Sequence, residues 1–354
     1  MKIAFYYRNV NGGIKTHVDA LEREFEGFGH EVKKINQFSL GSLMLGNSSG
    51  GISYGFDFAL RKIKKEVEGC DVLHIHHAAT SSEFLLPLSS ICSKCNVVNT
   101  FHIPVGNGLE GELAKSLIIT LVSLYAGRSK KFISVSAEIA DDIRRYSSWY
   151  GDNGNETETV VIPNGVDINR FYPVKEGEEG TDKKRTCIGY LGRLSSEKNL
   201  ITMIKAVKEL TSESRFDNVY LKIAGTGPVY DRLIRDADNR ITILGYVADA
   251  ASFYRSLDVF VLPSKLEAQP IALLEAMASG LPIIATDVGD NKYFVQGNGI
   301  LCGTSRNAIR AAIEAMLSED MAKMGAKSRQ IIEKGYTWDK IAERTLDVYK
   351  QIGV

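Results

Sequence analysis

Short apolar runs alternate with amphipathic segments along the chain, and each run predicts a buried strand that precedes a helix. In the first half, these runs predict strands at residues 2–7, 72–77, 97–102, 132–136 and 160–162. In the second half, they predict strands at residues 187–192, 219–224, 241–247, 259–262 and 299–302. Helical spacing follows the first run, with Val18, Leu21 and Phe25 on one face. Strands that alternate with helices in this way predict an α/β fold with parallel sheets.

The length of the chain predicts two domains, because 354 residues exceed what one hydrophobic core usually holds. Residues 175–185 are charged and contain glycine, so we interpret them as the linker between the domains, and residues 333–337 as a second crossing. We therefore expect a first domain over residues 1–172 and a second over residues 173–337. Apolar positions from Trp338 to Ile352 at helical spacing predict a last helix over residues 338–354.

Composition indicates a globular cytoplasmic protein, with 44% hydrophobic and 24% charged residues. A formal net charge of zero argues against nucleic acid as a partner. The apolar start, residues 1–7, is too short for a signal peptide, and the run at residues 117–125 is too short to span a bilayer. Five scattered cysteines include one C-x-x-C, Cys92 and Cys95, without two further zinc ligands, so we expect reduced thiols.

Residues 113–125 predict an apolar helix, and basic residues flank it up to Lys131. Such a segment can be a core helix with a basic end. It can also lie on a membrane surface, as amphipathic helices with basic flanks do. Peripheral contact with the inner face of a membrane through residues 113–131 therefore stays open.

The segment after strand 259–262 carries the strongest candidate chemistry. Pro270 and Gly280 predict the start and the end of a helix over residues 270–279, with Glu267 in the loop before it and Glu275 on it. The start of a helix attracts phosphate, and carboxylates accept hydrogen bonds from sugar hydroxyls. A sugar joined to a nucleotide diphosphate fits this combination, whereas two solvated carboxylates are the plainer interpretation. Backbone N–H groups for the phosphate are available at Ala268, Gln269 and Ile271.

Two cations flank the turn that follows strand 187–192. Arg193 and Lys198 precede a helix that we expect Asn199 to cap. Together the two cations can neutralise a diphosphate, although they could also be ordinary surface residues. The glycine turn at Gly225 follows strand 219–224, at the ligand side of the same predicted sheet.

Glycines and histidines end the strands of the first half. Gly12 and Gly13 make a turn after strand 2–7 that is either plain or lets the backbone approach a phosphate or an acceptor. Alternation places His74 and His76 on one face of strand 72–77 and His77 on the other, so we expect no metal site from these three. His102 ends strand 97–102, where open α/β sheets bind ligands.

The sequence resembles the retaining glycosyltransferases of family 4 (glycosyl transferases group 1). The resemblance rests on Glu267, seven residues and Glu275, followed by Ala-Met-Ala-Ser-Gly-Leu-Pro-Ile-Ile-Ala-Thr, on Gly-Arg-Leu-x-x-Glu-Lys-Asn at residues 192–199, and on Pro-Asn-Gly-Val-Asp at residues 163–167. It implies the GT-B fold, in which two Rossmann-like domains face each other across a cleft and helix 338–354 packs back on the first. The chain departs from the family at residues 268–270, where Ala-Gln-Pro replaces the common Gly-Phe-Gly.

The resemblance also implies roles for the candidate residues. Arg193 and Lys198 would stabilise the leaving diphosphate without a metal, Glu275 would hold the ribose, Glu267 would hold hydroxyls of the donor sugar, and His102 would contact that sugar near its reacting carbon. Further contacts to the donor are expected at Gly13, Gly225, Tyr246, Val247, Ala268, Gln269 and Ile271, and contacts to the acceptor at Gly12, Gly13 and His102.

The implied reaction is metal-independent transfer of a sugar, with retention, from a UDP- or GDP-sugar to a hydroxyl of a saccharide or lipid-linked acceptor. It needs no cofactor and would serve glycan, polysaccharide or glycolipid synthesis. Two alternatives stay open. One is a sugar-nucleotide epimerase or hydrolase on the same fold. The other is a nucleotide-binding oxidoreductase, although the chain has no G-x-G-x-x-G followed by an acidic residue.

Overall fold

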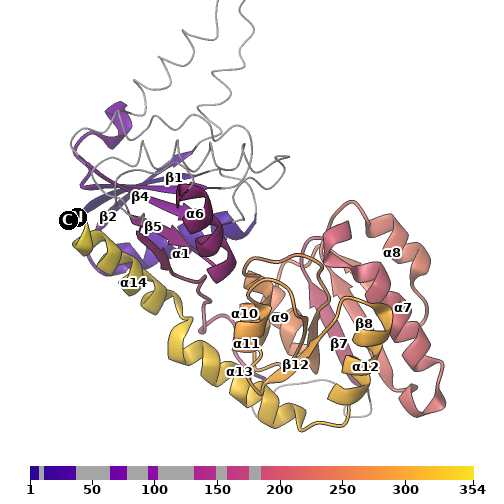
Figure 1. Cartoon of the computed structure of the whole chain (residues 1–354). Helices are drawn as coiled ribbons and strands as arrows, with labels where there is room; N and C mark the ends of the chain where they lie inside the picture. Colours follow the sequence, from indigo (N-terminus) through magenta and orange to yellow (C-terminus); the bar gives the residue numbers. More distant parts are fainter. Residues whose placement is uncertain (8–11, 37–63, 78–94, 103–130, 149–157, 175–184) are drawn as a thin grey trace, which may run out of the picture. The chain divides into compact units, whose positions relative to one another are not determined.

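The computed structural model describes residues 1–7, 12–36, 64–77, 95–102, 131–148, 158–174 and 185–354 (Figure 1). Packing divides the chain into unit 1, Met1–Asn164 with Trp338–Val354, and unit 2, Gly165–Thr337. Residues 113–130 of the segment considered for membrane contact, and all of the predicted linker except Arg185, lie outside the described residues. The domain boundary expected at residues 172 and 173 stays a prediction. Within the described part of the chain, every helix is too short or too polar to cross a bilayer.

Unit 1 contains a six-stranded parallel sheet in the order β2-β1-β3-β4-β5-β6. The strand order changes direction at β1: β2 lies on one side of it, and β3 to β6 follow on the other side, as in doubly wound α/β folds. The strands are β1 Lys2–Tyr7, β2 Glu31–Asn36, β3 Val72–His77, β4 Asn96–Phe101, β5 Lys131–Ser134 and β6 Glu158–Val161. In the described part of unit 1, the helices are α1 Gly13–Gly27, α6 Ala137–Ser148 and α14 Trp338–Gln351, and residues 64–67 are also helical.

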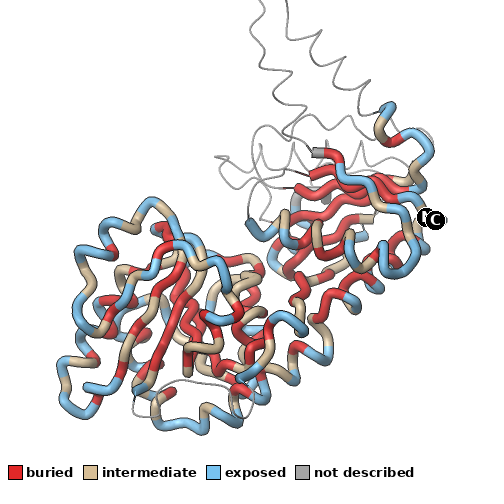
Figure 2. Tube along the Cα trace, turned by 180° about the vertical axis from the view of Figure 1, so that it is seen from behind, coloured by how far each residue is buried: buried red, intermediate tan, exposed pale blue. Residues whose placement is uncertain are grey.

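Alternate residues of β1 pack into different cores of unit 1. Phe5 packs with Leu21 of α1 and Tyr349 of α14, whereas Tyr6 packs with Leu73 on the opposite face of the sheet. Helix α14, from the end of the chain, thus packs in the unit that the first residues form, and the two termini lie side by side (Figures 1 and 2). Figure 2 shows the strands of this sheet as a buried layer.

Unit 2 contains a second six-stranded parallel sheet, in the order β12-β11-β10-β7-β8-β9. Its buried residues form one continuous core between the strands and the helices. The strands are β7 Thr186–Leu191, β8 Val219–Ala224, β9 Ile241–Gly245, β10 Val259–Leu262, β11 Ile283–Thr286 and β12 Gly299–Cys302. The helices are α7 Leu200–Thr211, α8 Tyr230–Asp236, α9 Ala250–Arg255, α10 Ile271–Ala278, α11 Asn291–Phe294, α12 Arg306–Met316 and α13 Met321–Gly335, with 3-10 turns η2 Ser196–Lys198 and η3 Ser214–Phe216.

The parallel α/β architecture predicted from the sequence is confirmed, and the element ends differ at several places. Helix α13 continues to Gly335, so Glu333 is helical and only Tyr336 and Thr337 separate α13 from α14. Asn199 stands at the start of α7 but does not cap it: its backbone is left-handed (φ 58°), and its side-chain amide donates to the carbonyl of Thr304 at 2.9 Å. Asn199 therefore ties the turn before α7 to the segment that follows β12.

Candidate active site

The turn after β7 and the loop after β10 meet through a buried ion pair. Lys198 Nζ lies 2.7 Å from Glu267 Oε1, and the Ser264 hydroxyl donates to the same oxygen at 2.6 Å. The backbone also joins the two segments, since the Lys265 N–H donates to the carbonyl of Glu197 at 2.8 Å. Glu267 is only 7% exposed, so Lys198 and Ser264 replace the water that a carboxylate would otherwise bind.

Close backbone packing behind Glu267 fixes the position of its loop. Gly289 has a left-handed backbone (φ 52°), and a Cβ on it would lie 2.0 Å from the Glu267 carbonyl oxygen. Thr286, at the end of β11, donates its hydroxyl to the carbonyl of Ser264 at 2.6 Å. The neighbouring strand therefore supports the loop from β10 at two points, and this requires glycine at residue 289.

Two glycine turns pack backbone to backbone at the ends of β7 and β8. A Cβ on Gly225 (φ 133°) would lie 1.8 Å from the carbonyl oxygen of Gly192. Two hydrogen bonds join the turns, from the Leu194 N–H to Thr226 O at 2.9 Å and from the Val229 N–H to Leu194 O at 3.1 Å. This contact holds the segment with Arg193 and Lys198 at the carboxyl ends of the strands, where α/β sheets bind ligands.

Three further residues expected at the donor are at least partly open to solvent. Arg193 is exposed, and its carbonyl accepts a hydrogen bond from the hydroxyl of Tyr190 at 3.0 Å. Tyr246 is 78% exposed just after the end of β9, and Val247 beside it is half-buried. Arg193 can therefore reach a ligand without breaking a contact in the core.

Glu275, on the second turn of α10, has surroundings unlike those of Glu267. Its Oε2 accepts a hydrogen bond from the hydroxyl of Tyr254 at 2.9 Å, and Tyr254 itself is fully buried. Burial raises the pKa of the Glu275 carboxyl to about 7, against the lowering effects of Tyr254 and of Arg170. Among the described residues, no hydrogen bond joins Glu275 to the Lys198–Glu267 pair. Both carboxylates therefore belong to unit 2 but are held by separate partners.

The start of α10 differs by one residue from the expectation. Pro270 is the residue before the helix, with extended backbone (φ −77°, ψ 118°), and the first helical residue is Ile271. The preceding loop is anchored through Ala268, whose carbonyl accepts from the Asp290 N–H at 3.4 Å, and through the buried Gln269. The N–H groups at this helix start face no side-chain cap.

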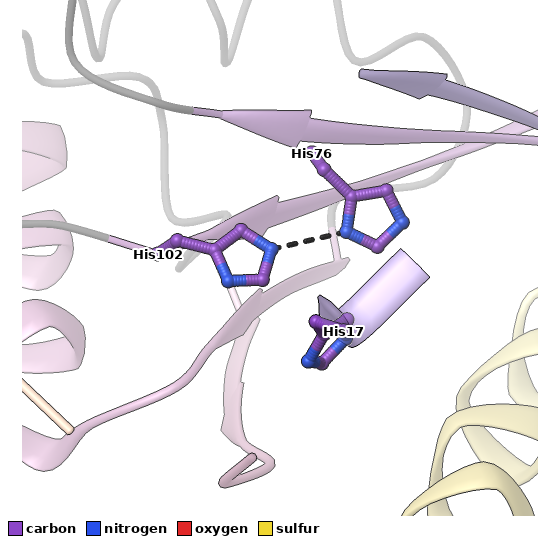
Figure 3. Close-up of side chains that lie close together, drawn as sticks. All are labelled: His17, His76 and His102. Atoms are coloured by element: carbon purple, nitrogen blue, oxygen red, sulfur yellow. Dashed lines mark hydrogen bonds between the residues drawn. The ribbon is translucent and has the colours of Figure 1, made fainter. Parts of the chain in front are cut away.

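In unit 1, three histidines from three elements form a buried cluster (Figure 3). His76 Nδ1, on β3, lies 3.1 Å from Nε2 of His102, the residue after β4. His17, on α1, stands edge-on to His102 with ring centroids 4.7 Å apart, and its Nδ1 lies 2.9 Å from Asn164 Oδ1. Gly12 precedes α1 and Gly13 begins it, and both are exposed.

The faces of β3 agree with the alternation predicted for its histidines. His74 binds Tyr349 of α14 and Thr100 of β4, each at 2.6 Å, on the face where His76 lies. His77 points to the opposite face, where it binds Asn99 at 2.9 Å. We did not predict from the sequence that His76 and His102 would meet His17. The available signal is that His17 lies four residues before Leu21, on the apolar stripe of α1.

The buried histidines are neutral at pH 7. Burial lowers the pKa of His17 and of His77 to about 4, although hydrogen bonds to Asn164 and Asn99 act in the opposite direction. Burial, reinforced by the neighbouring imidazoles, lowers the pKa of His74, His76 and His102 well below 6.5. Neutral imidazoles can hold a metal ion, and one ring nitrogen from each of His17, His76 and His102 lies within 4.8 Å of the others.

Comparison with known proteins places both halves of the chain among enzymes that transfer sugars. Residues 11–170 match the family described as Glycosyltransferase Family 4, and residues 185–319 match Glycosyl transferases group 1. A phosphatidyl-myo-inositol mannosyltransferase of Mycolicibacterium smegmatis is 28% identical over 98% of this chain and 92% of its own length. A UDP-Gal:alpha-D-GlcNAc-diphosphoundecaprenol alpha-1,3-galactosyltransferase of Escherichia coli is 29% identical over 82% of this chain and 78% of its own length.

Solved structures share the same architecture. A glycosyltransferase from Rickettsia africae superposes with a TM-score of 0.76 at 17% identity, covering 99% of this chain and 98% of that one. HepE of Anabaena in complex with UDP superposes with a TM-score of 0.74 at 16% identity, covering 99% of this chain and all of that one.

Proposed function

Because the chain belongs to the family 4, group 1 glycosyltransferases and has their GT-B fold, we propose that it transfers a sugar from a nucleotide diphosphate with retention of anomeric configuration. The observation that carries the proposal is the Lys198–Glu267 pair, supported from β11 and flanked by exposed Arg193 at the carboxyl ends of the strands of unit 2. It combines cations for a diphosphate with a carboxylate for sugar hydroxyls.

In this proposal, Arg193 and Lys198 stabilise the negative charge that develops on the leaving diphosphate, without a metal ion. Glu267, oriented by Ser264, accepts hydrogen bonds from hydroxyls of the donor sugar. Glu275 holds the ribose, and the exposed Tyr246 and Val247 lie along the base. Backbone groups of Gly225, Ala268, Gln269 and Ile271 complete the donor site of unit 2.

Unit 1 is proposed to bind the acceptor through the turn at Gly12 and Gly13, with His102 hydrogen-bonded to the transferred sugar. We expect no covalent sugar–enzyme intermediate, so that the acceptor approaches on the face from which the diphosphate leaves, and a diphosphate oxygen takes the proton of its hydroxyl. A saccharide or lipid acceptor agrees with the names of the relatives, which act on phosphatidyl-myo-inositol and on a diphosphoundecaprenol-linked sugar.

The donor is tested first with a thermal-shift panel of UDP- and GDP-sugars. A ligand present at 100 times its dissociation constant stabilises the folded chain by about 2.7 kcal/mol, so the correct donor will raise the melting temperature. The selected donor is then incubated with lipid-linked and saccharide acceptors, and proton NMR reads the anomeric configuration of the product. A product of inverted configuration refutes the retaining mechanism, and release of free sugar without transfer favours the epimerase or hydrolase alternative.

A further inference from the structure

The histidine cluster of unit 1 fixes where the protons lie, because few arrangements satisfy its nitrogens. A neutral imidazole carries one N–H and one bare nitrogen, so the 3.1 Å contact between His76 Nδ1 and His102 Nε2 needs one donor and one acceptor. The contact allows two arrangements. Either His76 donates from Nδ1 and His102 has its proton on Nδ1, or His102 donates from Nε2 and His76 has its proton on its own Nε2.

The second nitrogen of His76 decides between these arrangements. His76 Nε2 is buried and has no hydrogen-bond partner among the described residues. If His102 were the donor, this nitrogen would be a buried N–H without an acceptor, which folded proteins rarely tolerate. If His76 is the donor, the same nitrogen is a bare acceptor, and among buried backbone groups an unpaired acceptor is found more often than an unpaired N–H.

We infer that His76 donates its Nδ1 proton to His102 Nε2 and is a positioning residue that holds His102 in the tautomer with its proton on Nδ1. The lone pair of His102 is then occupied by His76, and the group that His102 can offer to a substrate is an N–H donor. If the chain has the function proposed above, on which this step rests, His102 donates this hydrogen bond to an oxygen of the transferred sugar. It serves neither as a base nor as a nucleophile.

Neighbouring rings hold the imidazole of His76, the hydrogen-bond donor, in place. Its ring stacks on His74 at a centroid distance of 4.2 Å, and Phe5 meets it edge-on at 5.3 Å. His74 is itself bonded at both nitrogens, to Tyr349 and Thr100. The Oδ1 of Asn164 accepts from His17 Nδ1–H, so the ring beside His102 also has a defined tautomer.

A metal ion bound by the same three histidines is the competing explanation. Histidine ligands almost always donate their second ring N–H to an outer partner, which fixes their orientation. His17 has such a partner in Asn164, whereas His76 Nε2 has none in the described part of the chain. This difference favours the hydrogen-bonded pair, and the experiment below includes zinc to separate the two.

The direct test is proton-detected nitrogen NMR of the full chain labelled with 15N-histidine at pH 7.5. The chain has 6 histidines, so each ring system can be assigned by single substitutions. We expect His76 and His102 both to carry the proton on Nδ1. A proton on His102 Nε2 overturns the inference, as does stoichiometric zinc binding that His76→Asn abolishes.

Two substitutions separate the hydrogen bond from the ring that provides it. His76→Asn keeps a donor near the position of Nδ1, whereas His76→Phe keeps a ring and removes the donor. We expect His76→Phe to release the tautomer of His102 and to lower kcat by roughly 10- to 100-fold, as for a slightly misplaced group, while His76→Asn retains most of kcat and the Nδ1 tautomer. Equal loss of kcat in both variants, with an unchanged His102 tautomer, overturns the positioning role.

His77→Phe is the matched control, because it makes the same exchange on the same strand at a buried histidine of the opposite face. It should leave the tautomer of His102 and the value of kcat as they are. The NMR result is independent of the reaction. If the chain transfers no sugar from any nucleotide donor but His102 carries its proton on Nδ1, the proposed function fails and the assignment stands.

Discussion

At the scale of single residues, the two candidate glutamates of unit 2 differ because they lie beside different partners, Glu267 buried and Glu275 half-buried. Glu267 faces a cation at 2.7 Å, whereas Glu275 faces the neutral hydroxyl of Tyr254. The sequence gives both as carboxylates eight positions apart and does not reveal this difference. Their responses to pH and to substitution should therefore differ.

The raised pKa of the Glu275 carboxyl predicts that donor binding depends on pH. A carboxyl with a pKa of about 7 is partly protonated at neutral pH. In its proposed role, Glu275 must lose that proton to accept hydrogen bonds from both ribose hydroxyls. Below pH 7, the KM for the donor should rise by up to about tenfold per pH unit, because the proton competes with the ribose. Glu275→Gln should bind the donor weakly at all pH values and lose this slope. The measurement is donor KM between pH 5.5 and 8.5, and an equal slope in both proteins would contradict the assignment.

Arg193 and Lys198 are both proposed to stabilise the leaving diphosphate, but their substitutions should differ in their effect on stability. Arg193→Ala and Lys198→Ala should each lower kcat by about 100-fold, as for one lost charge-stabilising donor. Only Lys198→Ala should lower the melting temperature, because it leaves Glu267 as a buried carboxylate without its cation. Adding Glu267→Gln should recover part of that loss in the double variant. Exposed Lys265→Ala is the control for removing a lysine, and full stability in Lys198→Ala would argue against the buried pair.

At the scale of elements, most strands and several helices could be predicted because hydrophobic periodicity is local. Strands β1, β3, β8, β10 and β12 begin and end at the predicted residues. Two strands were not predicted. Glu31–Asn36 of β2 contains only two apolar residues at the edge of the sheet, and Ile283–Thr286 of β11 was considered only as part of the glycosyltransferase motif. The cluster of His17, His76 and His102 could not be predicted, since it joins three elements whose contacts depend on tertiary packing.

Substitution of Gly289, which packs behind Glu267, should displace the loop that follows β10. Gly289→Ala places a methyl group against the carbonyl oxygen of Glu267, so the loop must move and donor affinity should fall by tenfold or more, roughly the effect of misplacing a binding group. Gly297→Ala is a matched control, because Gly297 is also left-handed (φ 78°) but has no atom within 4 Å of the added Cβ. Both variants should lose some stability from backbone strain. Equal donor affinity in the two, measured by calorimetry, would contradict the role of this contact.

At the scale of the whole molecule, the histidines are unequally distributed. All 6 lie between residues 17 and 102, and unit 2 contains none. Histidines that stay neutral in the folded protein take up protons on unfolding in mild acid, so acid lowers the free energy of unfolding. A carboxyl whose pKa is raised by folding binds its proton more tightly in the folded state, so acid raises the free energy of unfolding. The two units should therefore respond to acid in opposite directions.

We expect unit 1 to lose stability as the pH falls from 6.5 to 4, because its unfolded state binds more protons than its folded state over that range. For His17 and His77, with a folded pKa of about 4, the loss at pH 5 is roughly 2 kcal/mol each. Glu275 contributes stability to unit 2 that is present below pH 4.5 and lost as the pH rises through 7. Calorimetry and hydrogen exchange at pH 7.5 and 5.0 should show earlier unfolding of unit 1 at the lower pH. Equal acid sensitivity of both units would contradict this.

Helix α14 gives the chain a particular order of events during translation. Its Tyr349 hydroxyl binds His74 across 275 residues, and Ile341 and Tyr349 cover an apolar face that Phe5 and Leu21 share. A ribosome that adds about 5–20 residues per second needs roughly 10 to 35 s to travel from Asn164 to Trp338. During that interval unit 2 is synthesised, while the nascent unit 1 waits with this face uncovered and accessible to chaperones. A message truncated just before α14 would therefore yield a complete unit 2 attached to a unit 1 whose apolar face stays open.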